Sequence, residues 1–117
     1  MNRVNKYFRI AKRNALKGDD KSIKRQYKIG AVGIRTDGTV VVSNNIPAQN
    51  PTREAHAEAR LVRKLNWGSV VFVVRVLSNG KLSKSYPCSN CISSMKLRGI
   101  SKCYYSINDI EYGVISL

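Results

Sequence analysis

The hydrophobic and polar positions of the chain follow two periods, one helical and one typical of strands. Over residues 2–17 the apolar side chains recur at helical spacing, and most basic side chains fall on the opposite side. The stretch "EAHAEARLVRKLN" has helical composition and follows a segment with two prolines. A third segment begins at Pro87, which suits a first helical turn, and reaches Gly99, which suits a helix end. These patterns predict helices over residues 2–17, from about residues 52–55 to residue 66, and over residues 87–99.

Runs of β-branched and other apolar residues predict five strands. The runs "IGAVGIR" and "TVVVSN" flank Thr36-Asp37-Gly38, which has the composition of a hairpin turn. The run "SVVFVVRV" is apolar at nearly every position, as expected of a central strand that is covered on both faces. Between "KCYYSI" and the last β-prone run stand only two residues, Asn108 and Asp109, too few for a parallel crossover. We therefore expect an α/β three-layer sandwich: a mixed five-stranded sheet, flanked by about three helices, in which strands 4 and 5 form an antiparallel hairpin.

Length and composition narrow the class of protein. A chain of 117 residues with 43% hydrophobic residues can bury one core, so we expect one domain over residues 1–117. The sequence has no apolar run of membrane-spanning length, and its charged N-terminus lacks the features of a signal peptide. We therefore expect a cytoplasmic protein without membrane contact. Three cysteines are an odd number for a disulfide framework and favour metal binding or chemistry.

The charge balance suggests a class of partner. The chain holds 21 Lys and Arg against seven Asp and Glu, a net charge of +14. Such an excess favours association with a polyanion such as nucleic acid, and that association should weaken with salt. A merely solubilising surface is the alternative.

One histidine, two cysteines and a glutamate have the spacing of a catalytic zinc site. Cys88 and Cys91 stand three apart in an expected first helical turn, so both sulfurs can reach one ion. His56 lies at the start of another helix, and one His with two Cys leaves the fourth position of a tetrahedral zinc site open. Glu58 could direct its carboxylate at that position, where a zinc-bound water has a pKa of about 7. The alternatives are a redox pair of cysteines and a structural zinc with Cys103 as fourth ligand, although its strand context favours Cys103 as a buried core residue.

These motifs resemble a known family. His-Ala-Glu at 56–58, followed by Pro-Cys-x-x-Cys at 87–91, is similar to the signature of the zinc-dependent cytidine and deoxycytidylate deaminase superfamily. The resemblance implies the cytidine deaminase fold, one Zn²⁺ per chain and hydrolysis of cytosine to uracil with release of ammonia. It assigns catalysis to Glu58, which would take a proton from the attacking water, pass it to the base and help ammonia depart. The implied zinc ligands are His56, Cys88 and Cys91.

The same resemblance implies contacts with the substrate. Asn45, at the end of the second strand, matches an asparagine that contacts the sugar in many relatives. On general grounds it could equally be an asparagine that ends a strand in a turn. The backbone N–H of Ala57 would meet the base carbonyl, and the backbone carbonyl of Tyr86 would accept the exocyclic amine.

Departures from the family pattern indicate which branch of the superfamily the chain resembles. Free-cytidine enzymes usually carry Cys-Ala-Glu and three cysteine ligands, so the ligand set here is similar to that of the nucleotide and polynucleotide deaminases. The hairpin ending resembles the free-cytidine branch and some phage and toxin deaminases. The polynucleotide-editing enzymes have a pocket tryptophan before Pro-Cys, where this chain reads Ser-Lys-Ser-Tyr at 83–86. Thr-Leu-Glu, typical of the tRNA adenosine enzymes, is also missing, so the chain resembles a compact phage-type or toxin-like cytosine deaminase.

The substrate that best fits the charge is single-stranded DNA or RNA that contains cytosine. A basic loop over residues 21–28 would lie beside the pocket in the family topology, and tyrosine rings offer stacking platforms for bases. Tyr104 and Tyr105 are successive strand residues, so one of the two must face inward. The candidate contacts are Tyr27, Lys28 and Tyr86, with Lys21, Lys24, Arg25 and Tyr105 as further contacts to nucleic acid.

Two other functions stay open. A salvage enzyme for dCMP or cytidine would use the same zinc site but would leave most of the charge unexplained. A zinc-stabilised module that binds nucleic acid without turnover would not need Glu58.

Overall fold

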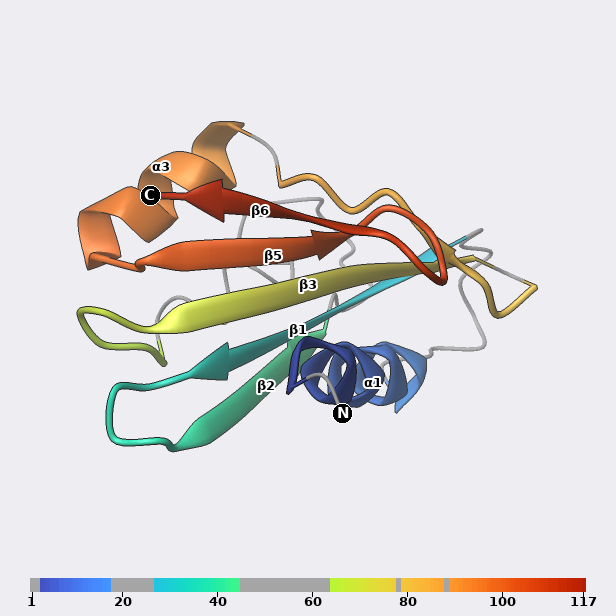
Figure 1. Ribbon diagram of the computed structural model, residues 1–117, viewed down its shortest axis with the longest axis horizontal. Coiled ribbons are helices and arrows are strands. Elements are labelled where there is room, and N and C mark those ends of the chain that lie inside the picture. Colours follow the sequence, from blue (N-terminus) through green and yellow to red (C-terminus); the bar gives the residue numbers. More distant parts are fainter. Residues whose placement is uncertain (1–2, 18–26, 45–63, 78, 88) are drawn as a thin grey trace, which may run out of the picture.

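The computed structural model describes residues 3–17, 27–44, 64–77, 79–87 and 89–117 and contains two helices and six strands in those ranges. Figure 1 shows an open, twisted sheet with one helix on each side. Neither of these helices is long and apolar enough to cross a membrane. In chain order the elements are α1 (Arg3–Lys17), β1 (Tyr27–Ile34), β2 (Val40–Asn44), β3 (Val70–Leu77), β4 (Leu82–Ser83), α3 (Ser89–Arg98), β5 (Lys102–Ser106) and β6 (Tyr112–Ser116).

The sheet has the predicted mixed topology. Its strand order is β2-β1-β3-β5-β6, and among these described strands only β3 and β5 pair in parallel. β5 and β6 form the expected antiparallel hairpin, with Lys102 opposite Ser116. The sixth strand, β4, pairs with the end of β3 and was not predicted, because a two-residue ladder leaves no periodic pattern in the sequence.

The helix predictions are confirmed for two of the three segments. α1 matches the expected range closely. α3 begins at Ser89, so Pro87 precedes the helix instead of lying in its first turn, which corrects the expected boundary. The middle helix falls mostly outside the described residues, and its last expected residue, Asn66, lies in a loop.

The central strand β3 is buried on both faces, as its uniform apolar pattern predicts. Because side chains alternate along a strand, its residues enter two separate cores. One core lies under α3 and contains Val71, Val73, Met95, Ile100 and Cys103. The other lies under α1 and contains Phe8, Ala11, Ala15, Phe72, Val74 and Val76.

The strand directions give the sheet two functionally distinct ends. β3 and β5 run in parallel, and β1 runs against them with Tyr27 opposite Leu77. We call the end where β3 and β5 finish and α3 begins the cysteine end, because Cys91 lies in the first turn of α3. We call the opposite end the tryptophan end, where the last turn of α3 lies against the loop that holds Trp67.

Candidate functional site

Cys91 is the one predicted zinc ligand that the structure describes, and it occupies the expected position. It lies in the first turn of α3 with a side chain that is only 3% exposed. The positive end of a helix dipole favours the thiolate, which is the form of cysteine that binds metal. The donor atom and its position therefore fit a zinc ligand.

The segment before α3 is fastened to the sheet by two buried serines, Ser85 and Ser106. The Ser85 hydroxyl donates to the carbonyl oxygen of Val73 at 2.9 Å and accepts the N–H of Ser106 at 2.8 Å. The Ser85 N–H donates to the Ser106 carbonyl oxygen at 2.9 Å, and the Ser106 hydroxyl donates to the carbonyl oxygen of Ser83 at 2.6 Å. These bonds join residues 83–85, which precede α3 in the chain, to β3 and β5.

The two serines lie where the parallel strands diverge. β3 pairs with β5 as far as Val73 and Tyr105, and beyond that point β3 pairs with β4 at Arg75 and Ser83. The chain that leads to Cys91 therefore leaves the sheet between the carboxyl ends of two parallel strands. In open α/β sheets, ligands bind outside the carboxyl ends of the strands.

Two of the predicted contact residues, Tyr86 and Tyr105, lie together. Their rings meet edge to face with centroids 5.1 Å apart and an interplanar angle of 78°. Tyr86 is 52% exposed, so its ring is open to a ligand, whereas Tyr105 is partly buried against the core under α3. Tyr104 points to the other face and stacks on Phe72 with ring centroids 4.6 Å apart. Each of the two strand tyrosines therefore packs on a core, and Tyr86 is the better candidate for stacking on a base.

Other predicted residues are placed only by their backbone or fall outside the described ranges. Tyr27 and Lys28 are the first residues of β1 and pair with Leu77 and Val76 at the cysteine end. β2 ends at Asn44, opposite Gly30 and thus toward that same end. The remaining predicted site residues lie outside the described residues and stay predictions: Lys21, Lys24, Arg25, Asn45, His56, Ala57, Glu58 and Cys88.

Cys103 is a core residue, as its strand context predicts. Its side chain is fully buried on β5, in the core under α3. Within the described ranges no three His, Cys, Asp or Glu side chains gather into a metal-binding group, and two of the predicted ligands, His56 and Cys88, lie outside those ranges.

A cavity of about 670 Å³ lies away from Cys91, on the α1 side of the sheet. Arg9 and Lys12 of α1 line one part of it, and Asp109 and Glu111 of the loop between β5 and β6 line another. The Asp109 carboxylate accepts the N–H of Leu82 at 2.7 Å. Because its walls carry opposite charges and no predicted ligand lines it, we do not assign the chemistry to this cavity.

Sequence reasoning missed the two buried serines and the exposure of Trp67. Serine is common in loops, so nothing in the sequence separates Ser85 and Ser106 from surface serines. Trp67 is 77% exposed, although a large aromatic side chain is usually expected to be mostly buried.

Comparisons with known proteins agree with the motifs. The family model described as "Cytidine and deoxycytidylate deaminase zinc-binding region" matches residues 1–107. A comparison with curated proteins finds no match.

Solved structures of cytidine deaminases have the same fold. The enzyme from Burkholderia pseudomallei superposes with a TM-score of 0.61 at 18% identity and covers 92% of this chain and 91% of its own. The enzyme from Mycobacterium leprae gives a TM-score of 0.60 at 15% identity, covering 94% and 91%. That from Mycobacterium tuberculosis gives 0.54 at 19%, covering 85% and 83%. The family model spans most of the sequence, and the fold agrees with it: the chain belongs to the cytidine and deoxycytidylate deaminase zinc-binding family.

Proposed function

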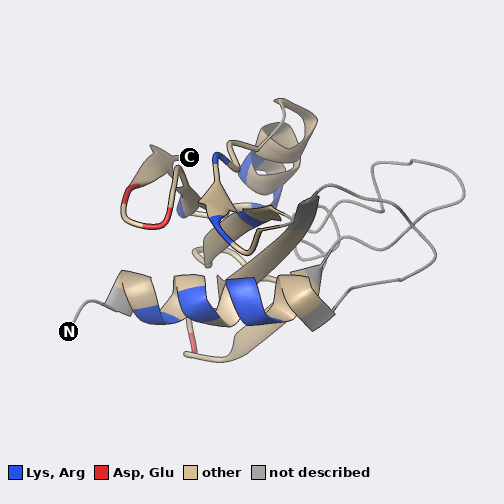
Figure 2. Ribbon diagram, turned by 90° about the vertical axis from the view of Figure 1, so that its right-hand side faces the viewer, with Lys and Arg blue, Asp and Glu red and all other residues tan. Residues whose placement is uncertain are grey.

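We propose that this protein is a zinc-dependent hydrolase that converts cytosine to uracil in single-stranded nucleic acid. Membership of the deaminase family supports the reaction. The observation that carries the choice of substrate is the net charge of +14, which a mononucleotide does not require. Figure 2 is consistent with this choice, since Lys and Arg recur along α1 while Asp and Glu are confined to two loops in the described part of the chain.

The proposed zinc ligands are His56, Cys88 and Cys91. Cys91 supports this assignment because its buried thiol stands at the start of α3. The chemistry that zinc supplies at such a site is activation of water as a nucleophile at neutral pH.

In the proposed mechanism the residues of this chain orient the base and move protons. Glu58 takes a proton from the attacking water and delivers it to the ring nitrogen next to the amino-bearing carbon. A new C–O bond forms at that carbon; Glu58 then takes the second proton from the new hydroxyl group and passes it to the amino group, which leaves as ammonia when the C–N bond breaks. Cytosine and water thus give uracil and ammonia with atoms and charge balanced.

Residues near the cysteine end would hold the base during these steps. The Tyr86 carbonyl oxygen accepts a hydrogen bond from the exocyclic amine, and the Ala57 N–H donates to the base carbonyl. The serine network supports this role of Tyr86, because Ser85 fixes the backbone immediately before it. Asn45 would contact the sugar, and the exposed ring of Tyr86 would stack on a neighbouring base.

A dCMP deaminase of nucleotide salvage is the second candidate, because the matching family is described for deoxycytidylate as well as cytidine. One or two cations would then suffice to bind the 5′ phosphate.

The test compares substrates at equal cytosine concentration: cytidine, dCMP, single-stranded DNA and single-stranded RNA. Uracil in each is quantified by mass spectrometry with zinc-loaded protein at low and high salt, with Glu58→Ala as control. We expect uracil mainly in a strand, and less of it at high salt. Uracil mainly from dCMP would make the protein a salvage enzyme. No uracil in any substrate, with zinc bound, would leave a binding module without turnover.

A further inference from the structure

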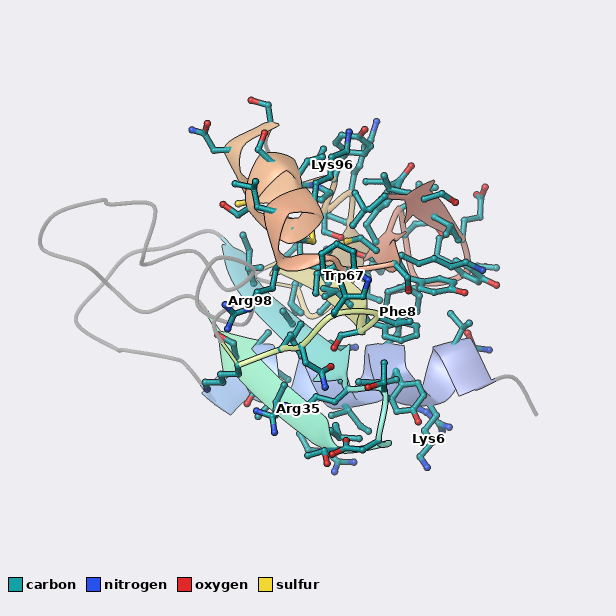
Figure 3. The ribbon with its side chains drawn as sticks, turned by 90° about the vertical axis from the view of Figure 1, so that its left-hand side faces the viewer. Lys6, Phe8, Arg35, Trp67, Lys96 and Arg98 are labelled. Carbon is teal, nitrogen blue, oxygen red and sulfur yellow. The ribbon has the colours of Figure 1, made fainter. Side chains whose placement is uncertain are left out.

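Trp67, at the tryptophan end of the sheet, is a large aromatic side chain displayed to solvent. It is the only tryptophan of the chain, and 77% of it is exposed. Figure 3 views this end of the molecule, with Trp67 near the middle and Arg35, Lys96 and Arg98 around it. Nothing in the proposed reaction uses these residues.

A rigid turn holds Trp67 in this exposed position. The Ser69 N–H donates to the Asn66 carbonyl oxygen at 3.2 Å, which closes a four-residue turn with Trp67 second and Gly68 third. Gly68 has a φ of +88°, a value typical of the third residue of a type II turn. The Ser69 hydroxyl donates to Oδ1 of Asn66 at 2.7 Å, a second hydrogen bond between the first and fourth residues of the turn. These bonds define the backbone position from which the indole projects.

The end of α3 supports the indole from one side. Gly99 ends the helix with a φ of +81°, its N–H donates to the Lys96 carbonyl oxygen, and the Ile100 N–H donates to the Met95 carbonyl oxygen. These two bonds form a Schellman motif. A Cβ on Gly99 would overlap the six-membered ring of Trp67, so the ring lies directly against the backbone there. The Gly68 N–H also donates to the Gly99 carbonyl oxygen at 2.8 Å, which ties the turn to the helix end.

Three cationic residues, Arg35, Lys96 and Arg98, share this end of the sheet with Trp67. Nε of Arg35 donates to the Lys64 carbonyl oxygen at 2.7 Å, and Nε of Arg98 donates to the Leu65 carbonyl oxygen at 2.9 Å. Both guanidinium groups are therefore hydrogen-bonded to the backbone of residues 64–65, which lead into the turn. Lys96 is exposed on the last turn of α3, where the helix dipole favours positive charge. We define the Trp67 surface as Arg35, Trp67, Lys96 and Arg98.

Among the described residues, one carboxylate side chain, that of Asp37, lies at this end of the sheet. A hydrogen bond from the Thr39 N–H lowers the pKa of Asp37, and the nearby charge of Arg35 adds to that effect. Asp37 is therefore ionised at neutral pH, but the three cations of the Trp67 surface outnumber it.

We propose that the Trp67 surface is a second contact site for single-stranded nucleic acid, in which a base stacks on the Trp67 indole and the surrounding cations contact phosphates. An exposed aromatic ring among cations is the combination that binds single strands without sequence preference. α3 has 10 residues and a length of about 15 Å, so a strand that covers several nucleotides can reach both ends of it. The use of this site in catalysis rests on the proposed function, but binding to it requires no turnover.

The test uses the fluorescence of Trp67, the single tryptophan, as a reporter at the site itself. The probe is an oligothymidylate of about twelve nucleotides, which contains no cytosine and so cannot be deaminated. We expect saturable quenching of Trp67 emission, with a dissociation constant that rises with salt. An oligonucleotide that binds by anisotropy but leaves the emission unchanged would overturn the proposal.

Variants separate stacking from general charge. Trp67→Ala should weaken binding of a labelled oligothymidylate about tenfold in an anisotropy assay. The matched control is Ile110→Ala, which removes an apolar side chain that is 89% exposed in the loop between β5 and β6, outside the Trp67 surface, and should bind as the natural protein does. Equal binding by Trp67→Ala and the natural protein would overturn the proposal.

A second pair of variants tests whether the cations act locally. Lys96→Ala and Lys6→Ala each remove one exposed lysine from a helix, but Lys6 lies on α1. We expect the Lys96 variant to raise the dissociation constant for Trp67 quenching more than the Lys6 variant. Equal effects on the dissociation constant would mean that binding depends on the net charge of the protein and not on the position of each lysine, and would overturn the proposal.

Three further outcomes separate this proposal from its alternatives. Emission that changes on dilution and not with oligothymidylate would make Trp67 a contact with a second copy of the chain, against the proposal. Uracil formation in strands without Trp67 quenching would overturn this inference and leave the proposed function standing. Quenching without uracil formation in any substrate would support this inference and overturn the proposed function.

Discussion

The side chains found at the two ends of α3 differ in their exposure to solvent. At the start of the helix, Cys91 is 3% exposed and its thiol is withdrawn from solvent. At the other end, Trp67 is 77% exposed and its ring rests on Gly99. One end therefore suits a metal ligand that must be shielded, and the other suits an aromatic platform that must be reached.

Both ends are fixed by small residues and backbone hydrogen bonds. Ser85 and Ser106 join the segment before α3 to β3 and β5. At the far end, the bond between Gly68 and Gly99 joins the Trp67 turn to the helix. The comparison suggests that the two ends of α3 have different functions. The reaction would take place at the cysteine end, and single-stranded nucleic acid would bind at the tryptophan end.

The largest expected effect is at the cysteine end, from Glu58→Ala. We predict a loss of uracil formation of about 1,000-fold or more with every substrate, because proton transfer in both halves of the reaction depends on this carboxylate. The measurement is uracil by mass spectrometry, with zinc content and Trp67 quenching as controls that should not change. Substantial activity in this variant would exclude Glu58 as the acid and base.

Removing a proposed zinc ligand should have the next largest effect. Cys91→Ala should lose zinc and fall below about one hundredth of the natural activity, a larger loss than outer-shell changes produce. The matched control is Cys103→Ala, which empties a buried position in the core and should cost about 1–2 kcal/mol of stability while keeping its zinc. Zinc is measured by elemental mass spectrometry on the folded proteins. Zinc retained in the Cys91 variant and lost in the Cys103 variant would reverse the assignment.

At the tryptophan end, Trp67→Ala should affect the oligonucleotide substrate and not the mononucleotide. We predict that kcat/KM for an oligonucleotide with one cytosine falls about tenfold, because stacking on Trp67 is lost, while kcat/KM for dCMP is unchanged. Steady-state rates with both substrates measure this. Equal losses for the two substrates would mean that Trp67 supports the fold of the active site, and the division between the ends would fail.

The smallest expected effect on turnover is from Gly99→Ala, which should act on stability instead. An alanine there must adopt a positive φ and also displace the Trp67 ring, so we predict a loss of about 1–3 kcal/mol in the free energy of unfolding. Gly80→Ala is the matched control, since Gly80 has a similar φ of +83° but nothing within 4 Å of its added Cβ, and it should cost about 1 kcal/mol.

Denaturant unfolding of both variants, with and without Trp67→Ala, completes a double-mutant cycle. Removal of the indole should reduce the cost of Gly99→Ala to that of Gly80→Ala. An unchanged cost would show that the indole does not rest on Gly99.

The sequence predicted those elements that local patterns determine. The helical spacing over residues 2–17 corresponds to α1, the apolar run of β3 to a strand buried on both faces, and the short connection at residues 108–109 to the β5–β6 hairpin. Each of these depends on side chains that are close in the sequence. Gly99 was also readable as a helix end, because its conformation is favoured by glycine alone.

Features that depend on contacts between distant segments were not readable. Ser85 and Ser106 stand 21 residues apart, and their hydrogen bonds exist only because α3 returns the chain to lie beside β3. The same crossover brings Tyr86 against Tyr105. Trp67 lies in a recognisable Gly turn, but its exposure results from the way the turn is tied to the end of α3. Of the candidate site, the position of Cys91 agrees with the sequence, while His56, Glu58 and Cys88 stay predictions.

The most direct test of the central claim is the salt dependence of substrate preference. An oligonucleotide with one cytosine competes with dCMP in one reaction, and the ratio of their kcat/KM values is measured between about 50 and 200 mM salt. Deamination of single strands by a chain of net charge +14 predicts a ratio well above one that falls steeply as salt rises. A ratio below one at both salt concentrations would contradict it and would identify the mononucleotide as the substrate.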